Sequence, residues 1–228
     1  MTNFVFLHVG ADPYVELLVH SIRKTNPNAR VIQCTDKLTE KVHGTTEIYR
    51  HNGDTSNLMT FRLEAFSALR LQEPAIYLDT DMIVLGEISP EAILKDSQVI
   101  CCKRSFERDS PINTSFRGMD LSEYQHQTLA EVYPIIACFT ITEDSSFWLE
   151  CFEDLIKLDQ KFHRWYGDQE AMRNVASSGK FRINYLPESH IACLPEFAQK
   201  DISPLCLHFK GGQRKVWMKE IFDEVFNP

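Results

Sequence analysis

Apolar stretches with strand character alternate with amphipathic helical stretches along this chain, and this alternation constrains its fold more than any other feature. Residues 4–9 are rich in β-branched and aromatic side chains, as strands are, and residues 29–35 repeat the pattern. Between them, Asp12 is expected to cap a helix with Pro13 at its first position. The apolar face of that helix comprises Val15, Leu18, Val19 and Ile22. The opening therefore predicts a strand–helix–strand unit.

The same alternation continues to the C-terminus. Further strands are expected at residues 47–50, 75–78, 98–102, 135–142, 181–186 and 205–209, and another apolar run covers residues 82–85. Further helices are expected to begin at Ser56 or Asn57, Ser89, Thr142 or Asp144, Gly167 and Trp217. Their inward side chains are predicted to include Met59, Leu63, Phe66, Leu69, Trp148, Phe152, Leu155 and Ile156. No repeat or linker interrupts the pattern, which predicts a single α/β domain over residues 1–228 with a mostly parallel central sheet flanked by helices.

The composition narrows the classes of partner. The 228 residues are 43% hydrophobic, enough for one sizeable core. The net charge is -8 and the longest basic cluster, residues 210–215, is short, so a nucleic acid polymer is not an expected partner. No apolar run approaches the ~20 residues of a membrane-spanning helix. The seven cysteines form no CxxC pair and are interpreted as small core residues in a reducing compartment, which predicts a cytoplasmic location.

The triplet Asp79-Thr80-Asp81 is the strongest chemical signal, because it directly follows the strand expected at residues 75–78. Side chains two residues apart in extended backbone point to the same side, so both carboxylates can reach one cation. Ligands of open α/β sheets collect at the carboxyl ends of strands. Hard oxygen ligands suit Mg²⁺ or Mn²⁺, which can bridge diphosphate oxygens. The alternative is a turn or helix cap, since Asp favours both.

The segment 208–217 is a second pattern. His208 lies at the end of an expected strand and is followed by two glycines, which let the backbone approach phosphates closely. Lys210 and Lys215 can hold a diphosphate as point charges. The alternative is a glycine turn with solvated lysines.

Two further polar positions have simple alternatives. Asp168 and Gln169 stand at the start of an expected helix, where an N-terminal cap would explain them. Arg62 lies on the helix before the Asp79 strand, where it can be a surface arginine that covers apolar surface.

Together, these motifs resemble the retaining GT-A glycosyltransferases of family eight, the glycogenin and bacterial galactosyltransferase type. The matching segments are, in order, 11–14 with 21–22, 61–63, 76–84, 167–171 and 208–211 with Lys215 and Trp217. The resemblance covers almost the whole chain. It implies a GT-A nucleotide-diphospho-sugar transferase fold with a nucleotide-binding half at residues 1–103 and an acceptor and sugar half at residues 104–228.

The resemblance also implies roles for single residues. Mn²⁺ or Mg²⁺ would be held by Asp79, Asp81 and His208. The nucleotide sugar would be bound by Val9, Gly10, Ala11, Asp12, Tyr14, Arg62, Asp79, Thr80, Asp81, His208, Lys210, Gly211 and Lys215. Within this set, Tyr14 would stack on the base. The catalytic pair would be Asp168 and Gln169, which would face the sugar near its anomeric carbon.

Two departures from the family pattern concern specificity. Ala11 stands where the family usually has a second polar residue in the first loop. Residues 135–138 read Ile-Ile-Ala-Cys, whereas the family usually has an Asn-Ala-Gly run entering the same strand. In relatives this strand edge contacts sugar. Base selectivity, donor sugar and acceptor therefore stay open.

The function that the resemblance implies is transfer of a hexosyl group from a UDP-sugar to an acceptor hydroxyl of a saccharide, lipid or protein, with retention. Front-face attack assisted by the leaving phosphate is favoured, and a covalent intermediate on Asp168 is the alternative. A sugar nucleotidyltransferase would need a glycine-rich basic loop, which residues 8–12 are not. A non-catalytic nucleotide-sugar-binding module is a third alternative, since a fold does not guarantee activity. The loop-rich residues 105–133 are interpreted as an acceptor lid or an ordinary surface excursion.

Overall fold

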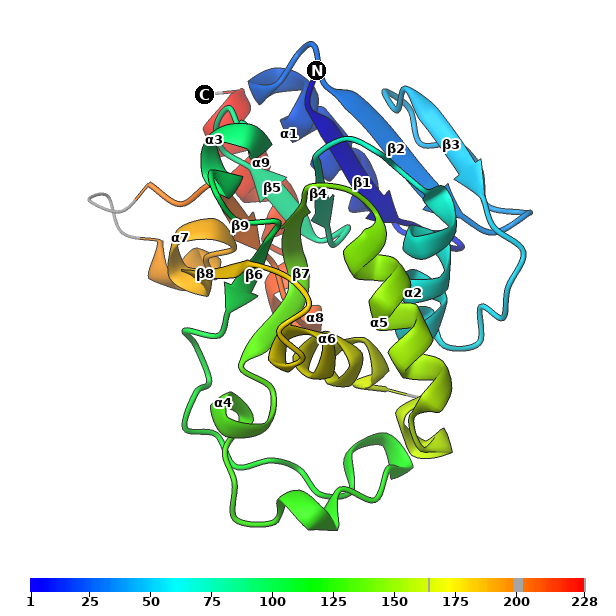
Figure 1. Cartoon of the computed structure of the whole chain (residues 1–228). Coiled ribbons are helices and arrows are strands. Elements are labelled where there is room, and N and C mark those ends of the chain that lie inside the picture. The colour runs from blue at the N-terminus through cyan, green and yellow to red at the C-terminus, as the bar shows by residue number, and fades with distance from the viewer. Residues whose placement is uncertain (164, 199–202, 228) are drawn as a thin grey trace.

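The computed structural model describes residues 1–163, 165–198 and 203–227. Within these residues, seven strands form one sheet in the order β3-β2-β1-β4-β7-β6-β8, and β5 pairs with β9 in a separate small sheet (Figure 1). The strands are β1 (Asn3–Leu7), β2 (Arg30–Thr35), β3 (Glu47–Arg50), β4 (Ala75–Leu78), β5 (Met82–Val84), β6 (Val99–Lys103), β7 (Ile135–Thr142), β8 (Ile183–Pro187) and β9 (Cys206–His208).

The large sheet is mostly parallel, as predicted. Strand β1 pairs in parallel with β2 and β4, β2 with β3, and β6 with β8. Strand β7 runs antiparallel to both β4 and β6. All eight residues of β7 are buried, which explains why its sequence is continuously apolar and β-branched rather than alternating.

Helices cover both faces of the large sheet (Figure 1). The α-helices are α1 (Val15–Thr25), α2 (Leu58–Leu69), α3 (Pro90–Leu94), α4 (Leu129–Val132), α5 (Ser146–Lys157), α6 (Gly167–Ser177), α7 (Glu188–Ile191), α8 (Gly212–Lys215) and α9 (Met218–Phe226). Alternate residues of β1 face opposite sides, so Phe4 and Phe6 pack with α1 and α3, whereas Val5 packs with α2, α5 and α6. No described helix is long and apolar enough to cross a membrane.

Two expected helix details are wrong. Helix α1 begins at Val15 with Tyr14 as its N-cap, and Asp12 accepts a hydrogen bond from the Tyr14 amide (2.9 Å) instead of capping the helix itself. Helix α5 begins at Ser146 after Ser145, and Ile156 is 60% exposed. The buried face of α5 is centred on Phe147, Trp148, Cys151 and Leu155, so Ile156 falls outside it.

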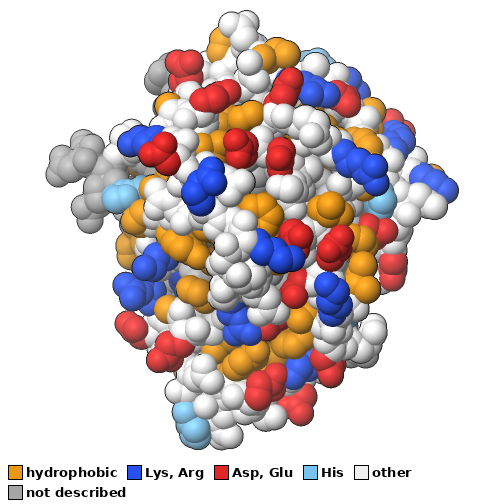
Figure 2. Space-filling view, viewed as in Figure 1, with side chains coloured by type: hydrophobic (Ala, Val, Ile, Leu, Met, Phe, Trp, Pro, Cys, Tyr) orange, Lys and Arg blue, Asp and Glu red, His pale blue; other side chains and the backbone are white. Residues whose placement is uncertain are grey.

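Other expectations are confirmed. Asn57 is the N-cap of α2, where its side chain accepts a hydrogen bond from the Met59 amide (3.1 Å). All seven cysteines are unpaired and buried, which fits their interpretation as small core residues. Apart from these expectations, Figure 2 shows acidic and basic side chains interspersed over one face of the molecule.

The segment between β6 and β7 has a small apolar core of its own. It contains α4 and two short 3₁₀ turns, Phe116–Gly118 and Ser122–Tyr124. Its buried residues, together with one from the turn after α5, are Ile112, Met119, Leu121, Val132, Tyr133 and Phe162. The segment is therefore loop-rich, as expected, but it is packed against the rest of the chain.

Candidate active site

The Asp79–Asp81 triplet is held from both sides by backbone hydrogen bonds. The Asp79 amide donates to the Cys138 carbonyl of β7 (3.0 Å), and the Phe209 amide donates to the Asp81 carbonyl (2.8 Å). Pairing of β5 with β9 sets His208 opposite Met82, one residue beyond the triplet. The small sheet therefore brings His208 to the carboxylates from a distant part of the sequence.

Asp79, Asp81 and His208 form a group that can hold a metal ion. One ligand atom from each residue lies within 4.8 Å of the others. The His208 Nε2 atom is 3.5 Å from Asp81 Oδ1 and 4.0 Å from Asp79 Oδ2. Two carboxylates with one imidazole suit a hard or borderline divalent cation, so the donor set fits Mn²⁺ or Mg²⁺.

Two basic side chains pair with the same carboxylates. The Arg62 guanidinium contacts Asp79 Oδ1 (2.6 Å) through one nitrogen and Asp168 Oδ2 (3.1 Å) through another. Lys215 Nζ lies 3.1 Å from Asp81 Oδ2. The side chain of Arg62 is only 10% exposed, so it is not the solvated surface arginine of the alternative interpretation.

These surroundings move the pKa values of the two ligand carboxyls in opposite directions. Burial raises the pKa of Asp79, even though Arg62 acts against it. Burial acts the same way on Asp81, but the hydrogen bond and charge of His208, together with Lys215, lower its pKa below the ordinary value. Asp81 is therefore the carboxylate that stays ionised most readily.

The third acidic residue, Asp168, lies in the first turn of α6 and is 1% exposed. Its pKa is raised by burial, which Arg62 opposes. Because Asp168 shares Arg62 with Asp79, helix α6 and the β4–β5 connection are joined through one cation.

A cavity of about 390 Å³ lies over these groups, and we call it the carboxylate cavity. The sequence-predicted residues that line it are Asp12, Arg62, Asp79, Thr80, Asp81, Asp168, Gln169, His208, Lys210 and Lys215. The rest of its lining includes Leu7, Met59, Ile136, Ala137, Cys138 and Trp165. The cavity lining therefore combines the candidate metal ligands and their cationic neighbours with apolar side chains.

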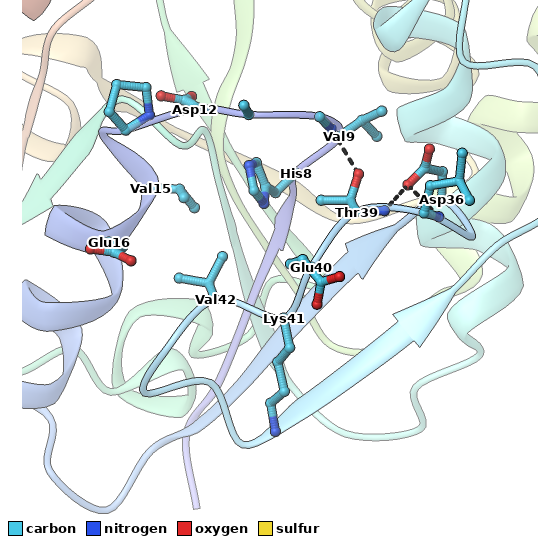
Figure 3. Close-up of a pocket in the computed structure, with 14 residues that line it drawn as sticks. His8, Val9, Asp12, Val15, Glu16, Asp36, Thr39, Glu40, Lys41 and Val42 are labelled. Atoms are coloured by element: carbon cyan, nitrogen blue, oxygen red, sulfur yellow. Dashed lines mark hydrogen bonds between the residues drawn. The ribbon is translucent and has the colours of Figure 1, made fainter.

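A neighbouring cavity of about 800 Å³, here called the loop cavity, lies between the segments that follow β1 and β2 (Figure 3). Val9, Gly10, Ala11 and Asp12 line it, as predicted. The Gly10 amide donates to Thr39 Oγ1 (2.7 Å), and the Thr39 amide donates to Asp36 Oδ1 (2.8 Å), so the two segments are tied together (Figure 3).

Asp12 joins the two cavities, because it lines both. Its Oδ2 accepts a hydrogen bond from Thr80 Oγ1 (3.0 Å), which fixes the first loop against the Asp79–Asp81 triplet. A ligand that places a planar group in the loop cavity and a charged group at the carboxylates would extend alongside Asp12.

Two predicted residues lie outside these linings. Tyr14 lines neither cavity and packs against the cluster that contains Ile83, Phe209 and Met218, so its position does not support stacking on a base in the loop cavity. Gly211 precedes α8 as its N-cap, with a φ of 85° that favours glycine, but it is not a lining residue.

Two polar residues of the site region were missed by sequence reasoning. Asp36 follows β2 directly, so the rule that ligands collect at strand ends could have found it. Arg104 follows β6 in the same way, and its Nη2 donates to Gln169 Oε1 (3.2 Å). Arginine after a strand is too common for that position alone to mark a site.

Several solved structures similar to this chain are glycosyltransferases. The galactosyltransferase LgtC, solved with donor and acceptor sugar analogues, is 15% identical over 98% of this chain and 95% of its own, with a TM-score of 0.55. GlyE of Streptococcus pneumoniae TIGR4 is 13% identical over 99% of this chain and 63% of its own, with a TM-score of 0.59. A glycosyltransferase involved in glycosylation of the major capsid of PBCV-1 is 12% identical over 95% of this chain and 99% of its own, with a TM-score of 0.55.

The comparison with protein-family models gives no match, and neither does the comparison with curated proteins. At the identities above, the structural similarity establishes the architecture alone. This chain has the GT-A fold of those glycosyltransferases.

Proposed function

We propose that this protein is a metal-dependent glycosyltransferase of the family-eight type, which moves a hexosyl group from a UDP-sugar to a saccharide hydroxyl with retention of configuration. The observation that carries the proposal is the convergence of Asp79, Asp81 and His208 within 4.8 Å at the end of β4, beside Lys215 and Arg62. The glycosyltransferase fold supports it, and so does LgtC, which was solved with donor and acceptor sugar analogues.

The two cavities suggest how the donor is bound. The loop cavity, at about 800 Å³, lies within the usual size range of ligand pockets and would take the base and ribose. The diphosphate would pass Asp12 toward Asp79 and Asp81, with the sugar in the carboxylate cavity near Asp168 and Gln169. In this arrangement residues 9–12 would contact the nucleoside. Tyr14 would stabilise the loop by packing against the apolar cluster that contains Ile83, Phe209 and Met218.

The bound divalent ion, held by Asp79, Asp81 and His208, would supply positive charge to the diphosphate oxygens. Lys215 and Lys210 would add charge where the leaving group becomes more anionic. Arg62 would keep Asp79 and Asp168 in place. In the front-face route the acceptor oxygen forms a bond to the anomeric carbon, the bond from that carbon to the phosphate oxygen breaks, and the acceptor proton passes to a phosphate oxygen.

The proposal also includes a division of the chain into two halves and a cellular location. Residues 1–103 would form the nucleotide-binding half and residues 104–228 the acceptor and sugar half. A cytoplasmic location accords with seven buried, unpaired cysteines.

The test is a turnover assay with UDP-glucose, UDP-galactose, UDP-N-acetylglucosamine and UDP-N-acetylgalactosamine, each with and without Mn²⁺. We expect Mn²⁺-dependent release of UDP from at least one of them, because water can replace the acceptor slowly. Asp81→Asn should abolish this release, and Asp96→Asn, an exposed position outside both cavities, should leave it unchanged. Turnover of a nucleoside triphosphate with a sugar phosphate, or tight UDP-sugar binding without turnover, would contradict the proposal.

A further inference from the structure

Gln169 has a defined amide orientation. It lines the carboxylate cavity from the first turn of α6, and its Oε1 accepts a hydrogen bond from Arg104 Nη2 (3.2 Å). A guanidinium has only donors, so the atom of the amide that faces Arg104 must be the oxygen. The amide nitrogen, Nε2, has no hydrogen-bond partner among the residues that the structure describes. It is therefore the group that Gln169 can offer to a ligand.

Arg104 is itself held firmly. It is 6% exposed, its Nε donates to the Tyr133 carbonyl (2.9 Å), and its amide donates to the Pro134 carbonyl (2.9 Å). These contacts join the end of β6 to the residues that enter β7. Arg104 therefore reaches Gln169 from a fixed base.

The chain that follows Arg104 is fixed too. The buried side chain of Glu188 accepts hydrogen bonds from the Ser105 amide (2.9 Å) and the Phe106 amide (3.1 Å) through its Oε2. The backbone at Arg104 is thus anchored on both sides. The terminal torsion of a free glutamine is broad and nearly two-fold, so an anchored arginine is an effective means of choosing one amide orientation.

We propose that Arg104 is a positioning residue, which turns the Gln169 amide so that its NH₂ group donates a hydrogen bond to an oxygen of the bound donor sugar. This inference rests on the proposed function. It assigns Gln169 the role of a hydrogen-bond donor and excludes its amide oxygen as the nucleophile, since that oxygen is turned toward Arg104. Asp168 is bound to Arg62 and to the backbone N–H of Gln169, so the two neighbours have separate roles.

The test is a double-mutant cycle on donor hydrolysis, with the UDP-sugar that the turnover assay identifies. Arg104→Met and Gln169→Ala should each lower kcat, by roughly tenfold or more, as expected when a donor in a preorganised site is lost or misdirected. The double variant should be no slower than Gln169→Ala alone, because Arg104 acts through Gln169. Arg104→Lys should recover part of the loss. The affinity for UDP with Mn²⁺ should stay within about twofold throughout.

Two further variants sharpen the result. Lys103→Met removes a neighbouring exposed cation of β6 and should leave kcat unchanged. Gln169→Glu keeps a partner for Arg104 but presents no N–H group, so it should be as slow as Gln169→Ala.

The positioning role is overturned if the losses of Arg104→Met and Gln169→Ala multiply in the double variant, or if the Gln169→Glu variant turns over as fast as the unaltered chain. Should Arg104→Met fail to fold, Arg104→Lys takes its place in the cycle. Its effect on kcat is then compared between the unaltered chain and the Gln169→Ala variant, and the same criterion decides. These outcomes are separable from failure of the proposed function, which would appear as absence of UDP release by the unaltered chain.

Discussion

Arg62 lies between Asp79 and Asp168, two carboxylates that come from segments far apart in the sequence. All three side chains are largely buried, so each charge depends on the others for compensation. Removing one member of a buried group of charges leaves an uncompensated buried charge. The resulting loss of stability is larger than the net stabilisation that the complete group provides. The donor site is therefore also a sensitive point for stability.

We expect Arg62→Met to lower the free energy of unfolding by about 3 kcal/mol, because Asp79 and Asp168 would remain buried without their cation. Urea denaturation monitored by tryptophan fluorescence measures this change. Arg182→Met is the matched control, since Arg182 is exposed and donates to the Asp96 carbonyl, and it should change stability by less than about 0.5 kcal/mol. Equal effects of the two substitutions would contradict the proposed role of Arg62.

Lys215 offers a second prediction. Its Nζ is paired with Asp81 at 3.1 Å, and Lys215 lines the carboxylate cavity. Lys215→Met should raise the Kd of UDP, in the presence of Mn²⁺, on the order of tenfold, as for loss of a charged hydrogen bond. Calorimetric titration checks this value. Lys219→Met alters a lysine with a 75% exposed side chain on α9, and it should bind UDP as the unaltered chain does. An unchanged Kd for Lys215→Met would remove Lys215 from the site.

Single residues differ in how far the sequence could predict them. Asp79 and Asp81 were found because a strand-end position and a two-residue spacing are both visible in the sequence, and their convergence with His208 is confirmed. The burial of Arg62 was not visible, because its two partners lie on other elements. Arg104 was missed for the same reason, since its contacts come from residues 133 and 169.

Helix α6 carries Asp168 and Gln169, and its entry is tightly packed. Tyr166, the N-cap, has a φ of 57°, and Gly167 follows it. A Cβ atom added at Gly167 would lie 2.1 Å from the Phe162 carbonyl oxygen and 3.0 Å from a Leu155 methyl group. Glycine at this position therefore lets the start of α6 approach the turn that follows α5.

We expect Gly167→Ala to lower stability by about 1–3 kcal/mol through overpacking and to reduce turnover more than UDP affinity, because α6 must shift and move Asp168 and Gln169. Gly86→Ala is the control, since a Cβ there meets nothing within 4 Å and its φ is not positive. Thermal unfolding and steady-state kinetics check both variants. Normal kcat in Gly167→Ala would show that the position of α6 is not critical.

Elements with a strong local pattern were predictable. The strands at 47–50, 75–78 and 135–142 have the bounds that the sequence predicted. The antiparallel direction of β7 was not predictable from its own residues, because a strand buried on both faces reads the same in either direction. The small core of residues 105–133 was missed because its apolar residues are spaced irregularly and pack with Phe162 from the turn after α5.

In the molecule as a whole, the two cavities lie where the segments after β1, β2 and β4 meet, and Asp12 connects them. The alternation of strands and helices predicted the α/β architecture, and the structural comparisons confirm it as the GT-A fold. The nucleotide and metal roles remain proposals. The two roles are coupled, because an anionic diphosphate is repelled by two carboxylates in an acidic protein. It would need the bound cation in order to approach them.

Calorimetric titration of UDP, with Mn²⁺ and then with the ion removed by a chelator, tests this coupling most directly. We predict that the unaltered chain and Asp96→Asn bind UDP only when Mn²⁺ is present, and that Asp79→Asn and Asp81→Asn lose this binding while they remain folded. Undiminished, Mn²⁺-dependent UDP affinity in either of the last two variants would contradict the account.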